Sequence, residues 1–68
     1  MSELGDAVFE ALGPEWRSVA EIADSIPRSE RKDLSTHREM VRKHLVTLEK
    51  YGFAERSTGS PVKWRRKA

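Results

Sequence analysis

The 68-residue sequence predicts a mainly α-helical α+β domain, in which three helices precede a small antiparallel β-hairpin. Apolar residues recur at intervals of three and four in three segments, which is the spacing of one face of an α-helix. Near the C-terminus, two alternating runs flank a turn that contains glycine, as in a β-hairpin. The length predicts one domain, residues 1–68, and the absence of cysteine excludes disulfides and thiolate metal ligands.

The first predicted helix covers about residues 3–13. Ser2 can cap its start, and its apolar stripe consists of Leu4, Val8, Ala11 and Leu12. The pair Gly13-Pro14 ends it, because glycine suits the position after a helix and proline cannot continue one. Its polar side is acidic, which makes it a candidate docking surface for a basic protein partner.

A very short strand is predicted around Trp16, and the second helix follows over about residues 18–26. Ser18 and Glu21 form an S-x-x-E capping box, in which each side chain bonds the main-chain amide of the other. The apolar stripe of this helix consists of Val19, Ile22, Ala23 and Ile26. Pro27 ends the helix. Residues 27–35 then lack apolar periodicity, which predicts an exposed loop with one turn at residues 29–32.

The third predicted helix covers about residues 36–51. Thr36 and Glu39 indicate a second capping box, and Gly52 suits the position after the last turn. The side of this helix that faces the core is predicted to carry Val41, Leu45, Leu48 and Tyr51, with His44 at its edge.

The predicted hairpin covers about residues 53–66, with its turn at the segment STGSP. Val62 and Trp64 share one face of the returning strand. Trp64 lies among cations, so it can stack on nucleic-acid bases. A small domain, however, has few large apolar groups from which to build its core. Core packing is therefore the favoured role of Trp64, and the same argument places Val62 beside it.

Charge is distributed unevenly along the chain. Residues 1–27 contain one basic and six acidic residues, a net of −5, whereas residues 28–68 contain twelve basic and five acidic residues, a net of +7. Such an asymmetry favours a polyanionic partner for the basic part of the chain. The alternative is a solvated surface on which the charges happen to segregate.

The order of these segments resembles a winged helix-turn-helix domain of the MarR/ArsR-type transcription regulators of bacteria and archaea. SVAEIADSI resembles the first helix of the motif, MVRKHLVTLEKYGFAERS the recognition helix that continues into the wing, and GSPVKWR the returning wing strand. The resemblance covers about residues 4–66 and implies a cytoplasmic transcription regulator that binds double-stranded DNA. The link at residues 27–35 is longer than the tight turn of the family.

In such a domain the third helix enters the major groove and the wing contacts the phosphate backbone. A rotation of 100° per residue from Val41 places the outer face of the helix at Thr36, Glu39, Lys43 and Thr47. The predicted DNA-binding residues are Thr36, His37, Arg38, Glu39, Arg42, Lys43, Thr47, Arg56, Lys63, Arg65 and Arg66. His37 is expected to be exposed near the helix start and to meet phosphate. Without Asn or Gln the bidentate adenine contact is missing, which predicts G·C-leaning or weakly specific binding.

Other functions find less support in the residues. His37 and His44 are too few for a metal site without further ligands, and no cofactor is expected. The sequence contains no glycine-rich phosphate loop and no nucleophile elbow, so no enzyme activity is expected. No apolar run reaches the length of about 20 residues that crosses a bilayer, so neither a membrane segment nor a membrane partner is expected.

The family that this chain resembles usually dimerises through additional helices. This chain has only its first helix outside the motif, so a monomer or weak homodimer is expected. Two rival functions stay open. One is a winged helix used for protein–protein contact, with Met40 or Val46 as an exposed anchor. The other is a phage-type accessory DNA-binding protein, such as an excisionase or a small repressor.

Overall fold

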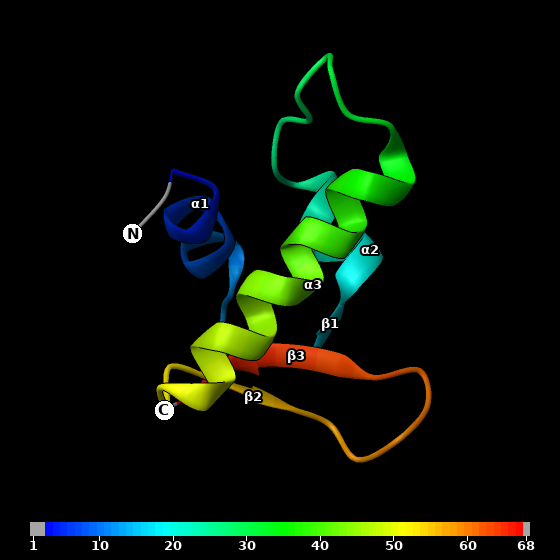
Figure 1. The fold of residues 1–68 in the computed structure, drawn as a ribbon. Helices are drawn as coiled ribbons and strands as arrows, with labels where there is room; N and C mark the ends of the chain where they lie inside the picture. The colour runs from blue at the N-terminus through cyan, green and yellow to red at the C-terminus, as the bar shows by residue number, and fades with distance from the viewer. Residues whose placement is uncertain (1–2, 68) are drawn as a thin grey trace.

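The computed structural model describes residues 3–67, which form three helices and one three-stranded antiparallel sheet (Figure 1). The elements follow one another as α1 (Glu3–Ala11), β1 (Arg17–Ser18), α2 (Val19–Asp24), α3 (Leu34–Lys50), β2 (Ala54–Arg56) and β3 (Lys63–Arg66). The long helix α3 runs from the 25–33 loop down to the sheet, with α1 and α2 on its two sides (Figure 1). The predicted α+β class is confirmed. Among residues 3–67, no helix has the length and apolar character needed to span a membrane.

The capping box of α2 is confirmed. The Glu21 amide donates to Ser18 Oγ over 3.1 Å, and the Ser18 amide donates to Glu21 Oε1 over 3.2 Å. The helix ends at Asp24, two residues before the predicted end, because the Ser25 amide and hydroxyl both donate to the Ile22 carbonyl. α1 also ends two residues early, at Ala11, and the proposed cap Ser2 lies outside the described residues.

The predicted start of α3 is wrong. Its N-cap is Asp33, whose Oδ1 accepts from the Thr36 amide over 2.7 Å, so the helix begins at Leu34. Thr36 therefore lies inside the first turn instead of preceding it, and no capping box forms with Glu39. The 25–33 loop contains the predicted turn, which the Lys32 amide closes by donating to the Ser29 carbonyl over 3.1 Å.

The end of α3 agrees with the prediction. Gly52 has a φ of 82°, a left-handed conformation that side chains disfavour. Its amide donates to the Glu49 carbonyl over 3.0 Å, and the Phe53 amide donates to the Leu48 carbonyl over 2.9 Å. These two bonds are the Schellman arrangement, and they turn the chain back into β2.

One apolar core joins all three helices to the inner face of the sheet. Its buried members are Val8, Leu12, Ile22, Ala23, Ile26, Val41, Leu45, Leu48, Ala54 and Trp64. The predicted core roles of Val41, Leu45, Leu48 and Trp64 are confirmed. Those of Tyr51 and Val62 are wrong, since they are 67% and 41% exposed. Tyr51 is the C-cap of α3, and Val62 precedes β3, so both lie beyond the packed parts of their elements.

The sheet has the strand order β1-β3-β2, so the short strand after α1 pairs with the hairpin. Trp64 is paired with Arg17 on one side and Arg56 on the other, and Glu55 is paired with Arg65. Because successive side chains of a strand point to opposite faces, Trp64 and Ala54 face the helices, whereas Glu55 and Arg65 face away from them. The register therefore divides the cations of the hairpin between two faces.

Candidate nucleic-acid interface

The outward face of α3 carries most of the predicted contacts of that helix. Thr36, Glu39, Lys43 and Thr47 are all exposed there, and Lys50 continues the same face one turn further on. Among the described residues, Lys43 and Lys50 have no ion-pair partner, so both ammonium groups are available to an anion. The Thr47 hydroxyl donates to the Lys43 carbonyl over 3.1 Å, which turns it back onto its own helix.

Arg42 lies at one edge of this face, where it is paired with Glu39 in the preceding turn. Arg42 Nε donates to Glu39 Oε2 over 3.2 Å, and Arg42 Nη2 donates to Glu39 Oε1. The hydrogen bond from Arg42 lowers the pKa of Glu39 below its ordinary value, and the same bond raises the pKa of Arg42. Both of these predicted contact residues therefore already have a partner.

Arg56 brings β2 against the same edge of α3. Its Nε donates to Glu49 Oε2 over 2.8 Å, its Nη2 donates to Glu49 Oε1 over 2.6 Å, and its guanidinium lies 5.0 Å from the centre of the Trp64 ring. The pKa of Arg42, raised mainly by Glu39, is lowered to a smaller degree by the charge of Arg56. Arg42 and Glu49 lie two turns apart on one side of α3, and Arg56 is bonded to Glu49, so the two guanidinium groups lie on the same side of the helix.

The other predicted wing residues point elsewhere. Arg65 donates to Glu55 on the outward face of the sheet, and its guanidinium lies 4.2 Å from the centre of the Trp16 ring. Lys63 is exposed near the start of α2, where its charge adds to the stronger effect of the Ser18 hydrogen bonds in lowering the pKa of Glu21.

Arg66 turns inward and holds the end of the chain against α1. Its Nη2 donates to the Phe9 carbonyl over 2.7 Å, and its guanidinium lies 4.4 Å from the centre of the Phe9 ring. The Arg66 amide also donates to the Gly13 carbonyl over 2.9 Å. Arg66 therefore joins two distant parts of the chain and does not reach the outward face of α3.

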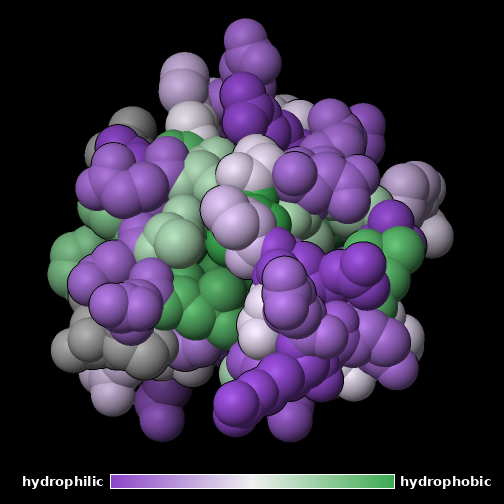
Figure 2. All heavy atoms as spheres, turned by 90° about the horizontal axis from the view of Figure 1, so that it is seen from above, coloured by the Kyte–Doolittle hydropathy of each residue, from purple (hydrophilic) through white to green (hydrophobic). Residues whose placement is uncertain are grey.

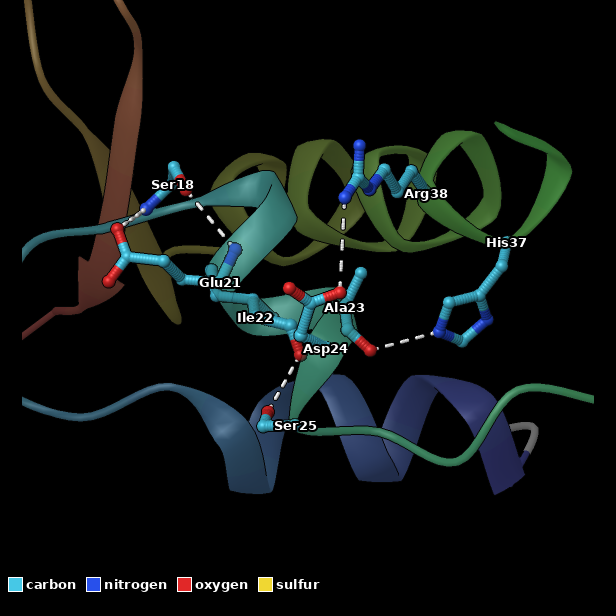
Figure 3. A network of polar contacts seen from close by, with 8 residues as sticks. All are labelled: Ser18, Glu21, Ile22, Ala23, Asp24, Ser25, His37 and Arg38. Atoms are coloured by element: carbon cyan, nitrogen blue, oxygen red, sulfur yellow. Dashed lines mark hydrogen bonds and ion pairs between the residues drawn. The ribbon is translucent and has the colours of Figure 1, made fainter. Parts of the chain in front are cut away.

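The expected exposure of His37 is wrong. Its side chain is 4% exposed, and Nε2 lies 3.0 Å from the Ala23 carbonyl at the end of α2 (Figure 3). A carbonyl only accepts, so Nε2 carries the proton. Arg38, the next residue, faces Asp24 of α2 at 3.9 Å (Figure 3). The sequence contained a signal for this, since His37, Val41 and Leu45 follow one another at intervals of four, on one helix face.

A cavity of about 300 Å³ lies between α1, the 25–33 loop and the start of α3. Its lining consists of Glu3, Leu4, Ala7, Ile26, Pro27, Ser29, Lys32 and His37. The end of the molecule that carries this loop shows apolar side chains gathered between hydrophilic ones (Figure 2). The volume is at the lower limit of small-molecule sites, and sequence reasoning did not predict it. Within residues 3–67, no three His, Cys, Asp or Glu side chains are grouped as a metal ion requires.

Comparisons of this chain with protein-family models, with curated proteins and with solved structures find no match.

Proposed function

We propose that this protein binds double-stranded DNA as a winged-helix domain, with the outward face of α3 in the major groove and the β2–β3 hairpin beside the phosphate backbone. The observation that carries the proposal is the junction of α3 and β2. There Arg42 and Arg56 lie on the same side of α3, and Lys43 and Lys50 are exposed on the adjoining outward face of the helix.

The roles of these side chains follow from their chemistry. Lys43 lies near the middle of the exposed face, where an ammonium group can donate to the guanine acceptors of the major groove. Thr36 lies in the first turn of α3, and its methyl group can contact thymine. Arg56, at the edge of the sheet, is suited to a backbone phosphate. His37 and Arg66 have no part in this proposal, because His37 is buried and Arg66 turns inward against α1.

The expected affinity depends strongly on salt. If Arg42, Lys50 and Arg56 each meet one phosphate, the slope of log K against log salt is about −2.7, which weakens binding about 40-fold between 50 and 200 mM. Direct contacts with base edges would change the affinity among sequences but would leave this slope nearly the same.

The proposal is tested by titrating a fluorescent 20-base-pair duplex of random sequence at both salt concentrations. We expect measurable binding at low salt, a large loss at high salt, and a clear loss for Lys43→Glu. Lys67→Glu makes the same charge change at an exposed residue after β3, outside the proposed surface, and is expected to weaken binding far less. Undetectable binding at low salt would refute DNA binding, whereas equal effects of the two variants would refute the proposed face.

A protein-binding role is the second candidate, and one surface favours it. Tyr51 and Phe53 are 67% and 54% exposed at the end of α3, and the Phe53 ring meets Phe9 edge to face at 6.1 Å. The anchors expected from the sequence, Met40 and Val46, are both partly buried instead. Analytical ultracentrifugation distinguishes a homodimer through the aromatic surface, which Phe53→Ser would dissociate, from a monomer that binds DNA.

A further inference from the structure

Two carboxylates lie on the surface that we propose to meet DNA, and each is bound to one of its arginines. Glu39 accepts from Arg42 through both oxygens, and Glu49 accepts from Arg56 through both oxygens, at 2.8 and 2.6 Å. Carboxylate and phosphate present the same pair of oxygen acceptors to a guanidinium group. The donors that would bind the DNA backbone are therefore occupied within the protein itself.

Both ion pairs are open to solvent. The side chains of Glu39 and Arg42 are each 49% exposed, and those of Glu49 and Arg56 are 31% and 45% exposed. Exposed ion pairs are weak in water, so a phosphate of high local charge density can displace the carboxylate. The hydrogen bond from its arginine holds the pKa of each glutamate below the ordinary value, so both carboxylates stay ionised at neutral pH.

We propose that Glu39 and Glu49 occupy the places of two backbone phosphates in the free protein, and that they thereby limit its affinity for DNA. This inference rests on the proposed function. On binding, each guanidinium exchanges a carboxylate for a phosphate, and the displaced carboxylate then lies beside the negatively charged backbone. Both the exchange and the resulting repulsion reduce the affinity.

The Glu49–Arg56 pair has a second effect, because it joins two elements. Glu49 belongs to the last turn of α3 and Arg56 ends β2, so their hydrogen bonds connect the proposed recognition helix to the wing. Exchange at Arg56 releases this connection, and the hairpin can then adjust to the backbone. Glu39 and Arg42 lie in successive turns of one helix, so exchange at Arg42 changes only a side chain.

The opposite role is physically reasonable and predicts the opposite sign. A carboxylate that binds Nε and Nη2 leaves Nη1 free, so Glu39 and Glu49 could position their arginines for phosphate. In that case their removal weakens binding. If instead the two arginines do not meet DNA, removal of either carboxylate has no effect beyond that of one added charge.

The test compares Glu39→Gln, Glu49→Gln and Glu10→Gln in duplex titrations from 50 to 200 mM salt. Glu10 is exposed on α1, so its variant matches the change in net charge away from the proposed surface. Removal of one negative charge beside the backbone raises the effective charge that the protein presents to DNA by up to one, which makes the salt slope steeper by up to about 0.9 and tightens binding by up to about eightfold at 0.1 M salt. We expect Glu39→Gln and Glu49→Gln to tighten binding about three- to eightfold and to steepen the slope, and Glu10→Gln to change neither.

A double-mutant cycle shows whether the gain acts through the arginine. In the Arg56→Met background, Glu49→Gln is expected to bring a smaller gain in affinity, because only the repulsion between Glu49 and the backbone is then relieved. Thermal unfolding of each variant checks that the fold is retained. The inference is overturned if wild-type protein binds and the glutamine variants bind no more tightly than Glu10→Gln, or if the gain from Glu49→Gln is undiminished in the Arg56→Met background. Failure of DNA binding itself differs from this result, because neither wild type nor any variant then binds at low salt.

Discussion

Replacement of His37 by alanine is expected to destabilise the fold without changing the salt dependence of the proposed DNA binding. The imidazole is 4% exposed, and its Nε2 donates over 3.0 Å to the Ala23 carbonyl, which connects the start of α3 to the end of α2. The same carbonyl also accepts from the Ile26 amide over 3.1 Å, so the substitution does not leave it without a partner. The loss is one net hydrogen bond, about 1 kcal/mol.

The space left by the ring adds a second contribution. Truncation of a side chain at a close-packed site costs about 1–2 kcal/mol beyond the hydrogen bond, and the higher helix propensity of alanine offsets about 0.5 kcal/mol. The free energy of unfolding should therefore fall by about 2 kcal/mol, which corresponds to a Tm lower by about 8–16 °C in a domain of this size. His37→Phe retains the ring and should lose only about 1 kcal/mol, the net value of one hydrogen bond.

Thermal and urea unfolding, followed by circular dichroism at neutral pH, measure these changes. His44→Ala is the matched control, because His44 is a partly buried histidine of the same helix whose side chain has no hydrogen bond among the described residues. Its expected effect is less than half that of His37→Ala. The assignment is refuted if His37→Ala unfolds like wild type and weakens DNA binding with a shallower salt slope, which is the behaviour of a phosphate contact.

Substitutions at Asp33, Gly52 and Leu45 test the local structure, and those at Asp33 and Gly52 each have a control variant. The Thr36 hydrogen bond lowers the pKa of Asp33, so the stabilisation by this cap is present at neutral pH and is lost as the pH falls below about 4. Asp33→Ala should lower the Tm by about 5 °C at pH 7 and less at pH 3, whereas Asp33→Asn keeps a cap without this pH dependence. Gly52→Ala should cost about 1–2 kcal/mol in urea unfolding because of its φ of 82°, and Gly59→Ala, where φ is not positive, should be nearly neutral. Leu45→Ala, at a fully buried position, should cost about 2–5 kcal/mol and leave much of the protein unfolded by circular dichroism at 25 °C.

Helical periodicity and end signals predicted the elements because both are local. Val41, Leu45 and Leu48 repeat at the spacing of one helix face, and the structure buries all three. The S-x-x-E box at Ser18 correctly placed the start of α2. The similar pattern at Thr36 did not form a capping box. In such a box the Glu39 side chain would accept from the Thr36 amide, but this amide donates to Asp33 instead.

The partners of the arginines in the hairpin could not be predicted from residues that are near to them in the sequence. Arg65 and Arg66 are neighbours in the sequence and were predicted to act together, but the strand register sends one to the outward face and the other against Phe9. Nothing within four residues of Arg66 indicates that its partner is the Phe9 carbonyl, 57 positions away. The same is true of Arg56 and Glu49, whose bond requires that β2 returns beside the last turn of α3.

The sequence by itself determined the α+β class, the order of the elements, most of the core and the basic character of the third helix and the hairpin. Each of these depends on residue type and on spacing within one helix or strand. Only the tertiary structure decided that Arg66 holds α1 and that Glu49 is bonded to Arg56 at the junction of α3 and β2. Whether a charged side chain is free to bind an anion depends on which groups the fold brings within hydrogen-bond distance of it. Except in the pair of Glu39 and Arg42, the partner of each ion-paired arginine lies on another helix or strand.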